Sequence, residues 1–217
     1  DLCTIEFMDK IIDAGVKVFK IEGRARSAEY VKRCAQCYRQ AADAVCEGTY
    51  SPEFAKTLKD ELSEVFNRGF WDGYYQGAKL GEWSDVYGSH ATRKKVYCGK
   101  VTNWFDRIGV AEIAVESKAL TMGAKCMATG ATTGVIEFTV NDWRVALKPA
   151  EKAEKGVRCS VAIVPENQGV RDGEVEKGDG SDSKSRADAD AVLVNADGKI
   201  PVRLRRGDKI YIWEPND

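Results

Sequence analysis

The sequence predicts a multi-domain α+β protein, in which the terminal β/α units of an incomplete TIM-like (β/α) barrel precede a small antiparallel β-barrel. Two observations predict this class. Residues 1–48 carry helix, strand and helix patterns with short connections, which is typical of β/α units. Residues 95–217 carry short runs of strand-forming residues between Gly, Asn and Asp, which is typical of antiparallel barrels. Because one strand cannot form a sheet alone, we expect earlier β/α units outside this chain.

The end of the β/α barrel is predicted over residues 1–48. Its first helix follows from apolar residues at helical spacing, namely Ile5, Met8, Ile11 and Ile12. Gly15 ends this helix as a C′ glycine, and residues 16–22 follow as a strand of alternating apolar and charged residues. Ser27 then caps a second helix that runs to Gly48.

Residues 49–94 form a predicted connector. Ser51 and Pro52 begin a helix, and its apolar stripe consists of Phe54, Leu58, Leu62, Val65 and Phe66. An aromatic loop over residues 68–77 and a polar run from His90 to Lys95 complete the link. The aromatic rings have two interpretations: they stack on RNA bases, or they seal the seam between the two domains.

The terminal β-barrel is predicted over residues 95–217. Its expected strands cover residues 97–101, 109–115, 134–140, 191–194 and 209–213. Between residues 148 and 190 we expect a mobile, solvated insertion, because the segment is polar and rich in Gly, Ser and Asp around one short apolar run at 161–164.

Composition excludes several classes of protein. The net charge is −1, which argues against a protein that coats a polyanion along its whole surface. No apolar run is long enough to span a bilayer, and we expect no membrane partner. With one histidine, a Ser-His-Asp triad or a His-rich zinc site is not supported.

The seven cysteines are an odd number without a secretion signal, which predicts a reducing compartment, the cytoplasm. Cys34 and Cys37 lie within the second predicted helix. A redox Cys-x-x-Cys pair would begin a helix instead, so we interpret both as small packing residues.

Four charged residues at the end of the predicted strand are the candidate catalytic site: Lys20, Glu22, Arg24 and Arg26, called the rim residues below. Active sites of β/α barrels lie at the C-terminal ends of strands and in the loops that follow. Lysine and arginine there suit an anionic substrate such as a carboxylate or a phosphate. The alternative is a salt-bridged rim that binds no ligand.

Basic residues gather in two further places, and they are the candidate RNA-binding residues. They are Arg93, Lys94, Lys95, Arg203, Arg205 and Arg206. A modest RNA-facing patch and an ordinary solvated face explain them equally well.

The motif Phe-Lys-Ile-Glu-Gly-Arg-Ala-Arg-Ser-Ala-Glu-Tyr-Val at residues 19–31 resembles the collagenase-like peptidase U32 family. The Asp-Leu-Cys at residues 1–3 and the Gly-Tyr-Tyr-Gln-Gly at residues 73–77 are similar to that family as well. Within the family, the arrangement is most similar to the C-terminal portion of the tRNA hydroxylation protein branch.

The resemblance implies an enzyme that makes 5-hydroxyuridine at the wobble position of tRNA with prephenate as cosubstrate. It also implies an iron–sulfur cluster on four cysteines, of which Cys3 would be the last. The other three, and the remaining barrel, would precede residue 1, so the fragment alone is expected to be inactive. The rim residues would bind prephenate or an RNA phosphate.

Two alternatives stay open. A collagenase-like peptidase of the same family would need a nucleophile with a base, or a catalytic metal site, and neither is visible in the sequence. A non-enzymatic barrel that docks RNA or a protein partner would need only the basic patches.

Overall fold

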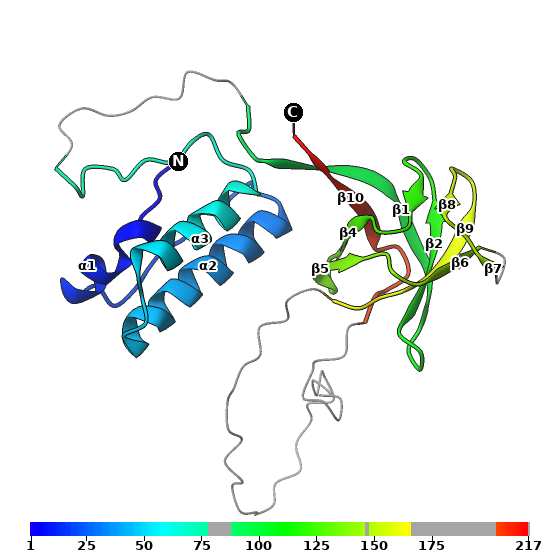
Figure 1. The fold of residues 1–217 in the computed structure, drawn as a ribbon, viewed down its shortest axis with the longest axis horizontal. Helices are drawn as coiled ribbons and strands as arrows, with labels where there is room; N and C mark the ends of the chain where they lie inside the picture. The colour runs from blue at the N-terminus through cyan, green and yellow to red at the C-terminus, as the bar shows by residue number, and fades with distance from the viewer. Residues whose placement is uncertain (78–87, 146–147, 166–202, 217) are drawn as a thin grey trace, which may run out of the picture. The chain divides into compact units, whose positions relative to one another are not determined.

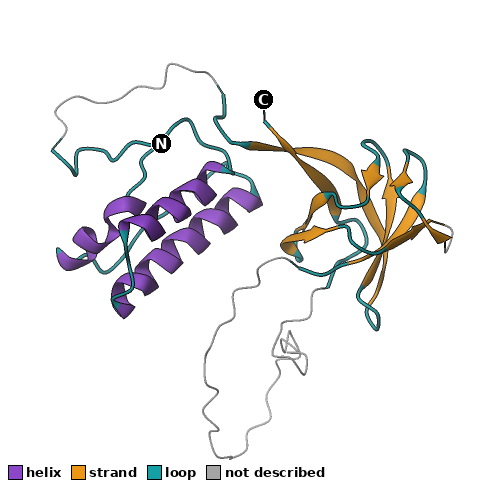
Figure 2. Ribbon diagram, in the orientation of Figure 1, coloured by secondary structure: helices purple, strands orange, loops and turns teal. Residues whose placement is uncertain are grey.

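The computed structural model describes residues 1–77, 88–145, 148–165 and 203–216. The described chain divides into two compact units (Figure 1). The first comprises Asp1–Val96 and Trp213–Asp217, and the second comprises Tyr97–Ile212. Among the described residues, the helices lie in the first unit, and most of the large antiparallel sheet lies in the second (Figure 2).

The first unit is built from a short 3-10 helix and α-helices α1 to α3. The bounds are η1 Ile5–Phe7, α1 Met8–Asp13, α2 Ala28–Glu47 and α3 Pro52–Ser63. The predicted capping is confirmed at two ends: the Ser51 side chain accepts a hydrogen bond from the Phe54 N–H at 3.1 Å, and Gly48 ends α2 with φ of 72°. Ser27 is the residue before α2, as predicted, but its side chain makes no capping hydrogen bond. The helix predicted to reach Phe66 ends at Ser63.

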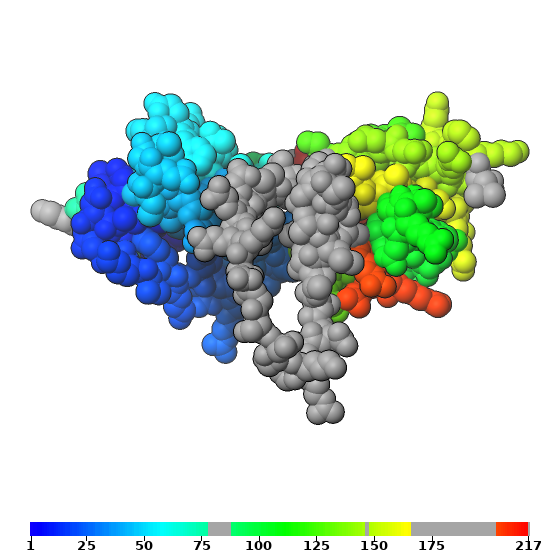
Figure 3. All heavy atoms as spheres, turned by 90° about the horizontal axis from the view of Figure 1, so that it is seen from below, coloured from blue at the N-terminus to red at the C-terminus, as the bar shows by residue number. Residues whose placement is uncertain are grey.

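A single apolar core holds these helices together. It contains buried residues from η1, α1, α2 and α3, namely Ile5, Met8, Cys34, Cys37, Ala41, Leu58 and Leu62. Cysteine and alanine on α2 let α2 and α3 approach closely. The space-filling view shows this unit as packed atoms in blue and cyan (Figure 3).

The predicted strand over residues 16–22 is wrong for this chain, because the segment forms no ladder with the described residues. Its apolar side chains remain solvent-exposed, and Val18 retains 83% of its accessible surface. Strand-forming side chains need a neighbouring strand and a covering layer to become a strand. The predicted units of a TIM-like barrel are therefore not confirmed.

The second unit contains one large antiparallel sheet with the strand order β5-β4-β10-β1-β2-β9-β6-β7, and a small sheet of β3 and β8. The bounds are β1 Arg93–Phe105, β2 Val110–Val115, β3 Leu120–Thr121, β4 Lys125–Gly130, β5 Gly134–Thr139, β6 Trp143–Val145, β7 Lys148–Pro149, β8 Lys152–Ala153, β9 Arg158–Ala162 and β10 Lys209–Pro215. The predicted antiparallel architecture is confirmed.

Alternation along the strands separates a buried face from an outer face. On β2, Ala111, Ile113 and Val115 are buried, while the residues between them point outward. Trp143 and Phe138 are among the largest buried side chains of this core.

Two sequence predictions about the strands need correction. The polar run that was expected to end the connector forms the start of β1 from Arg93 onward. The insertion expected from residue 148 is also wrong over its first part, since β9 pairs with both β2 and β6 and Cys159 and Val161 are buried. The strand expected at 191–194 and the rest of the insertion lie outside the described residues. Among the described helices, none is long and apolar enough to cross a membrane.

Candidate functional site

A cavity of about 550 Å³ in the first unit collects the rim residues and Cys3. Its walls come from residues 16–22, the loop before α2, the N-terminal residues and residues 65–70. Lys20, Glu22 and Arg24 are exposed at this cavity, and Arg26 is half-buried. The four rim residues therefore share one cavity, although the strand that was expected to present them is not formed.

Backbone contacts shape the loop that presents the arginines. The Glu22 carboxylate accepts a hydrogen bond from the backbone N–H of Arg24 at 2.7 Å, and the backbone N–H of Arg26 donates to the carbonyl of Gly23 at 3.0 Å. Ala25 has φ of 57°, a left-handed conformation that is costly for a residue with a Cβ atom. The loop is thus held in a tight turn, and the side chain of Glu22 is its anchor.

Two aromatic rings fix the guanidinium of Arg26. It lies 4.1 Å from the ring centroid of Phe66 and 5.6 Å from that of Tyr30, within the range of cation–π attraction. Neither partner was predicted from the sequence. The spacing of four residues between Arg26 and Tyr30 was an available signal, whereas the contact with Phe66 depends on the tertiary fold.

Cys3 is buried in the wall of the cavity. Its Sγ accepts a hydrogen bond from the Tyr38 hydroxyl at 3.8 Å, and its backbone N–H donates to the carbonyl of Trp71 at 2.8 Å. Burial raises the pKa of the Tyr38 hydroxyl, so Tyr38 stays protonated and can serve as the donor to sulfur.

The cysteines of this chain are not sufficient for an iron–sulfur cluster. Of the seven, Cys3 and Cys34 line the cavity, and such a cluster needs four ligands. Among the described residues, no group of three or more His, Cys, Asp and Glu side chains is arranged to hold a metal ion. The described residues of this cavity therefore do not provide a complete set of cluster ligands.

The interpretation of Cys34 and Cys37 as buried packing residues is confirmed. Both lie in the core of the first unit. Burial raises the pKa of the Cys34 thiol, and it raises the pKa of the Cys37 thiol to about 12. Neither thiol is an activated nucleophile.

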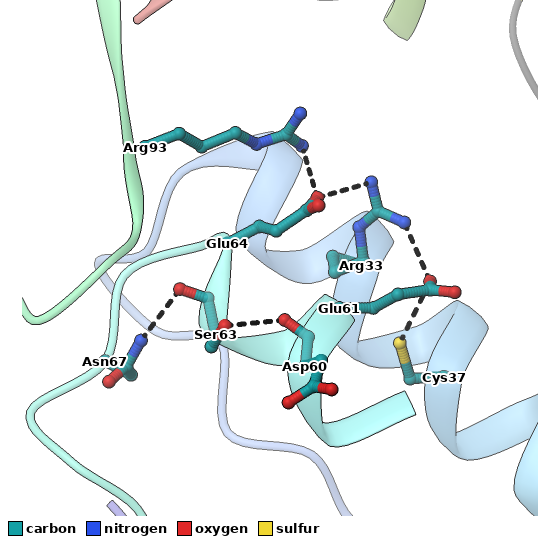
Figure 4. Close-up of polar contacts among 8 residues, drawn as sticks. All are labelled: Arg33, Cys37, Asp60, Glu61, Ser63, Glu64, Asn67 and Arg93. Atoms are coloured by element: carbon teal, nitrogen blue, oxygen red, sulfur yellow. Dashed lines mark hydrogen bonds and ion pairs between the residues drawn. The ribbon is translucent and has the colours of Figure 1, made fainter. Parts of the chain in front are cut away.

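Arg93, which was predicted to bind RNA, is held by protein contacts (Figure 4). Its guanidinium lies 3.1 Å from the Glu64 carboxylate and 3.9 Å from the ring centroid of Trp213. The same Glu64 carboxylate lies 3.3 Å from Arg33 on α2. Arg93 therefore connects the start of β1 to α3 and to the end of β10 within the first unit, and its charge is neutralised there.

The two lysines that follow Arg93 differ in their surroundings. Both lysines are exposed, and Lys95 pairs with Glu29 at 2.5 Å. Burial acts to raise the pKa of Glu29, but hydrogen bonds from Lys95 and Ser27 outweigh it and lower that pKa overall. These contacts give Lys95 a structural partner.

In the second unit, Arg203, Arg205 and Arg206 are exposed on the segment before β10, which is orange-red in the space-filling view (Figure 3). Arg203 lies 3.6 Å from the Asp106 carboxylate. The backbone N–H of Arg205 donates a hydrogen bond to the Asp208 carboxylate at 2.8 Å. The side chain of Arg205 is exposed to solvent.

The aromatic loop packs largely on its own unit. Phe70 lies against the helical core, and Trp71 forms a β-bridge with Leu2. Tyr74 and Tyr75 remain more than half exposed, although Tyr75 lies 5.9 Å from the ring of Phe7. Two of the rings are thus structural, and two present faces to solvent.

Comparison with known proteins connects this cavity to a family. Residues 1–85 match the family model described as Peptidase family U32. A protein named collagenase from Porphyromonas gingivalis is 52% identical over 163 residues, which cover 75% of this chain and 39% of that protein.

Two further relatives carry different names. A protein named uncharacterized protease MJ0090 from Methanocaldococcus jannaschii is 34% identical over 177 residues, covering 80% of this chain and 42% of that protein. The tRNA hydroxylation protein P of Haemophilus influenzae is 32% identical over 121 residues, covering 55% of this chain and 26% of that protein. The chain thus spans less than half the length of these relatives.

Proposed function

We propose, from the premise that this chain belongs to Peptidase family U32 through residues 1–85, that it is the C-terminal portion of an RNA-hydroxylating enzyme. The reaction is the formation of 5-hydroxyuridine at the wobble position of tRNA, with prephenate as cosubstrate. The name of the relative from Haemophilus influenzae supports the choice of tRNA hydroxylation. Free cysteines throughout the chain are compatible with action in the cytoplasm, where tRNA is found.

The observation that carries the proposal is the collection of cationic side chains around one cavity. Lys20, Arg24 and Arg26 line it together with Arg68. Prephenate carries two carboxylates, and arginine and lysine are the residues that bind carboxylates most directly. A volume of about 550 Å³ is in the range of small-molecule sites.

The residues of the cavity take distinct roles in this proposal. Arg26, fixed between Phe66 and Tyr30, orients one carboxylate, because a guanidinium held by ring contacts loses little freedom on binding. Lys20 and Arg24 reach the second carboxylate from the exposed side of the cavity. Glu22 is a positioning residue, since its carboxylate holds the backbone of Arg24.

In this proposal, the chain contributes one ligand to an iron–sulfur cluster. Cys3 would contribute a thiolate at the wall of the cavity, and the Tyr38 hydroxyl would donate a hydrogen bond to that sulfur. The remaining ligands would come from outside this chain, because Cys34 is the one other cysteine that lines the cavity and it packs in the core. The cluster would supply redox chemistry when it is bound.

The second candidate is a collagenase-like peptidase, which is favoured by the name of the relative at 52% identity. The cavity offers little support for it. The residues that line the cavity include no histidine, and the thiols of Cys34 and Cys37 are held protonated by burial. A peptidase needs an activated nucleophile or a metal-bound water.

The deciding experiment expresses the gene that encodes this chain in a bacterium that lacks tRNA hydroxylation. Mass spectrometry of digested tRNA should then detect 5-hydroxyuridine. Lys20→Ala and Arg24→Ala should each lower its level at least about tenfold, by loss of a charge-assisted contact. Lys56→Ala is the matched control, because Lys56 is exposed on α3 and does not line the cavity.

Two outcomes would contradict this proposal. If the same cells contain no 5-hydroxyuridine while the purified protein cleaves labelled gelatin without iron, the peptidase candidate replaces the hydroxylase. If the two rim variants retain the level of the wild-type protein, the cavity is not the cosubstrate site.

A further inference from the structure

We propose that the outer face of the sheet in the second unit carries a groove that binds the sugar–phosphate backbone of RNA without reading its sequence. The proposal deepens the proposed function, on which the identity of the polyanion as RNA rests. The groove has a volume of about 520 Å³ and is lined by Lys100, Val101, Thr102, Ala114, Glu116, Arg158, Arg206 and Gly207.

Strand register places two of the cations in a row. Lys100 on β1 pairs with Ala114 on β2, and Ala114 pairs in turn with Arg158 on β9. Because neighbouring strands lie about 4.8 Å apart, the Cα atoms of Lys100 and Arg158 are separated by about 10 Å. The small side chain of Ala114 leaves the space between them open, so it forms the floor of the groove.

A third cation reaches the groove from the turn before β10. Gly207 donates its N–H to the carbonyl of Val101 at 2.8 Å, and Val101 donates its N–H to the carbonyl of Asp208 at 2.8 Å. The buried Asp208 carboxylate accepts from the backbone N–H of Arg205 at 2.8 Å. These bonds fix the turn against β1, so the backbone of Arg206 has a defined position at the edge of the groove.

The charge of the lining is positive. Glu116 is its only carboxylate among the described residues, and it pairs with Lys100 at 2.7 Å. Arg158 lies 3.9 Å from the Glu112 carboxylate, and its side chain is 69% exposed. Exposed pairs of this kind are weak, so a phosphate can compete with either carboxylate.

The shape and composition of the groove favour a nucleic-acid backbone over other anions. Its cations are spread along the groove instead of converging on one point, which suits a chain of phosphates better than a single phosphate. Among the described residues that line it, none has an aromatic side chain on which a base could stack. Recognition is therefore electrostatic and independent of base sequence.

The test measures binding of a fluorescein-labelled tRNA anticodon-arm RNA to the full chain by anisotropy, over a range of salt concentrations. Arg158→Gln and Arg206→Gln should each remove one phosphate contact, which lowers affinity roughly five- to eightfold at about 0.1 M salt and reduces the slope of log affinity against log salt by about 0.7 to 0.9. Ala114→Phe should lower affinity without a change of charge, because it fills the floor.

Arg203→Gln is the matched control, because Arg203 is exposed on the same segment but does not line the groove. The groove is refuted if Arg203→Gln weakens binding as much as Arg206→Gln does, or if the groove variants bind as the wild-type chain does. It is refuted as well if the wild-type chain does not bind this RNA. Loss of 5-hydroxyuridine formation with intact RNA binding would refute the proposed reaction and leave the groove in place.

Discussion

Gly99 allows β1 and β2 to approach each other. Its replacement by alanine should destabilise the second unit by more than the change in backbone conformational freedom alone would cause. Gly99 lies opposite Val115 in the ladder between β1 and β2. A Cβ atom on residue 99 would lie 1.9 Å from the carbonyl oxygen of Ala114. The atom it meets belongs to the backbone, so a change of rotamer cannot relieve the contact.

The magnitude follows from this overlap. Real Cβ atoms essentially never approach another heavy atom within 3.0 Å, so the two strands must separate by about 1 Å at this point. Forcing an extra methyl group into a packed site typically costs about 1–3 kcal/mol. Backbone hydrogen bonds next to it, such as that from the Glu116 N–H to the carbonyl of Cys98, add about 1 kcal/mol each when they are broken. We expect Gly99→Ala to lower the free energy of unfolding by about 3 kcal/mol.

Hydrogen exchange of the full chain, followed by mass spectrometry, measures this cost in the peptides of β1 and β2 while the α2 peptide serves as reference. Gly109→Ala is the control, because Gly109 has φ of 63° but no heavy atom lies within 4 Å of the position that a Cβ atom would take. Its expected cost is about 1 kcal/mol, the penalty of a left-handed residue alone. Equal losses in the two variants would refute the steric argument.

Three other predictions concern single residues. Gly130→Ala should destabilise the second unit by about 2 kcal/mol in urea, because its Cβ would lie 1.9 Å from the buried Asp208 carboxylate. Glu29→Gln should destabilise the first unit at neutral pH. Because folding lowers the pKa of the Glu29 carboxyl, the stability that this carboxylate contributes is fully present well above the ordinary pKa of 4.5 and is lost as the pH falls through the lower folded pKa. The melting temperatures of the wild-type protein and the variant should therefore converge in acid. Iodoacetamide at mildly alkaline pH should label the exposed Cys46 first and leave Cys37, whose pKa is about 12, unlabelled until the protein unfolds, and fast labelling of Cys37 would show that the core is open.

The elements that could be predicted from the sequence are those whose information is local. Ser51 and Gly48 mark helix ends through their own chemistry, and the apolar stripe of α2 needs only one chain segment to be recognised. By contrast, β9 was missed. Its sequence, Arg-Cys-Ser-Val-Ala, is built largely from small residues, whose burial depends on the neighbouring strands and not on hydropathy.

In the candidate site too, local features could be predicted from the sequence and long-range contacts could not. The charged residues at 20–26 were found because a motif of neighbouring residues carries them. The contacts that give them their geometry join distant parts of the chain: Phe66 to Arg26, and Tyr38 to Cys3. The error over residues 16–22 has the opposite origin, because there the local pattern is strong and the neighbouring strand is absent from the described residues.

The contacts of the basic residues show why charge alone does not identify a binding surface. Arg93 lies in the most basic run of the sequence, but its guanidinium is neutralised by Glu64 and covered by Trp213. An RNA phosphate would therefore have to displace partly buried partners. Arg158 stood alone in a segment expected to be a loop, yet strand register places it across Ala114 from Lys100. Because a partly buried pair resists competition and an exposed one yields to it, the isolated arginine is the better candidate for RNA. Arg206 is a better candidate than Arg203 because Arg206 lines the groove and Arg203 does not.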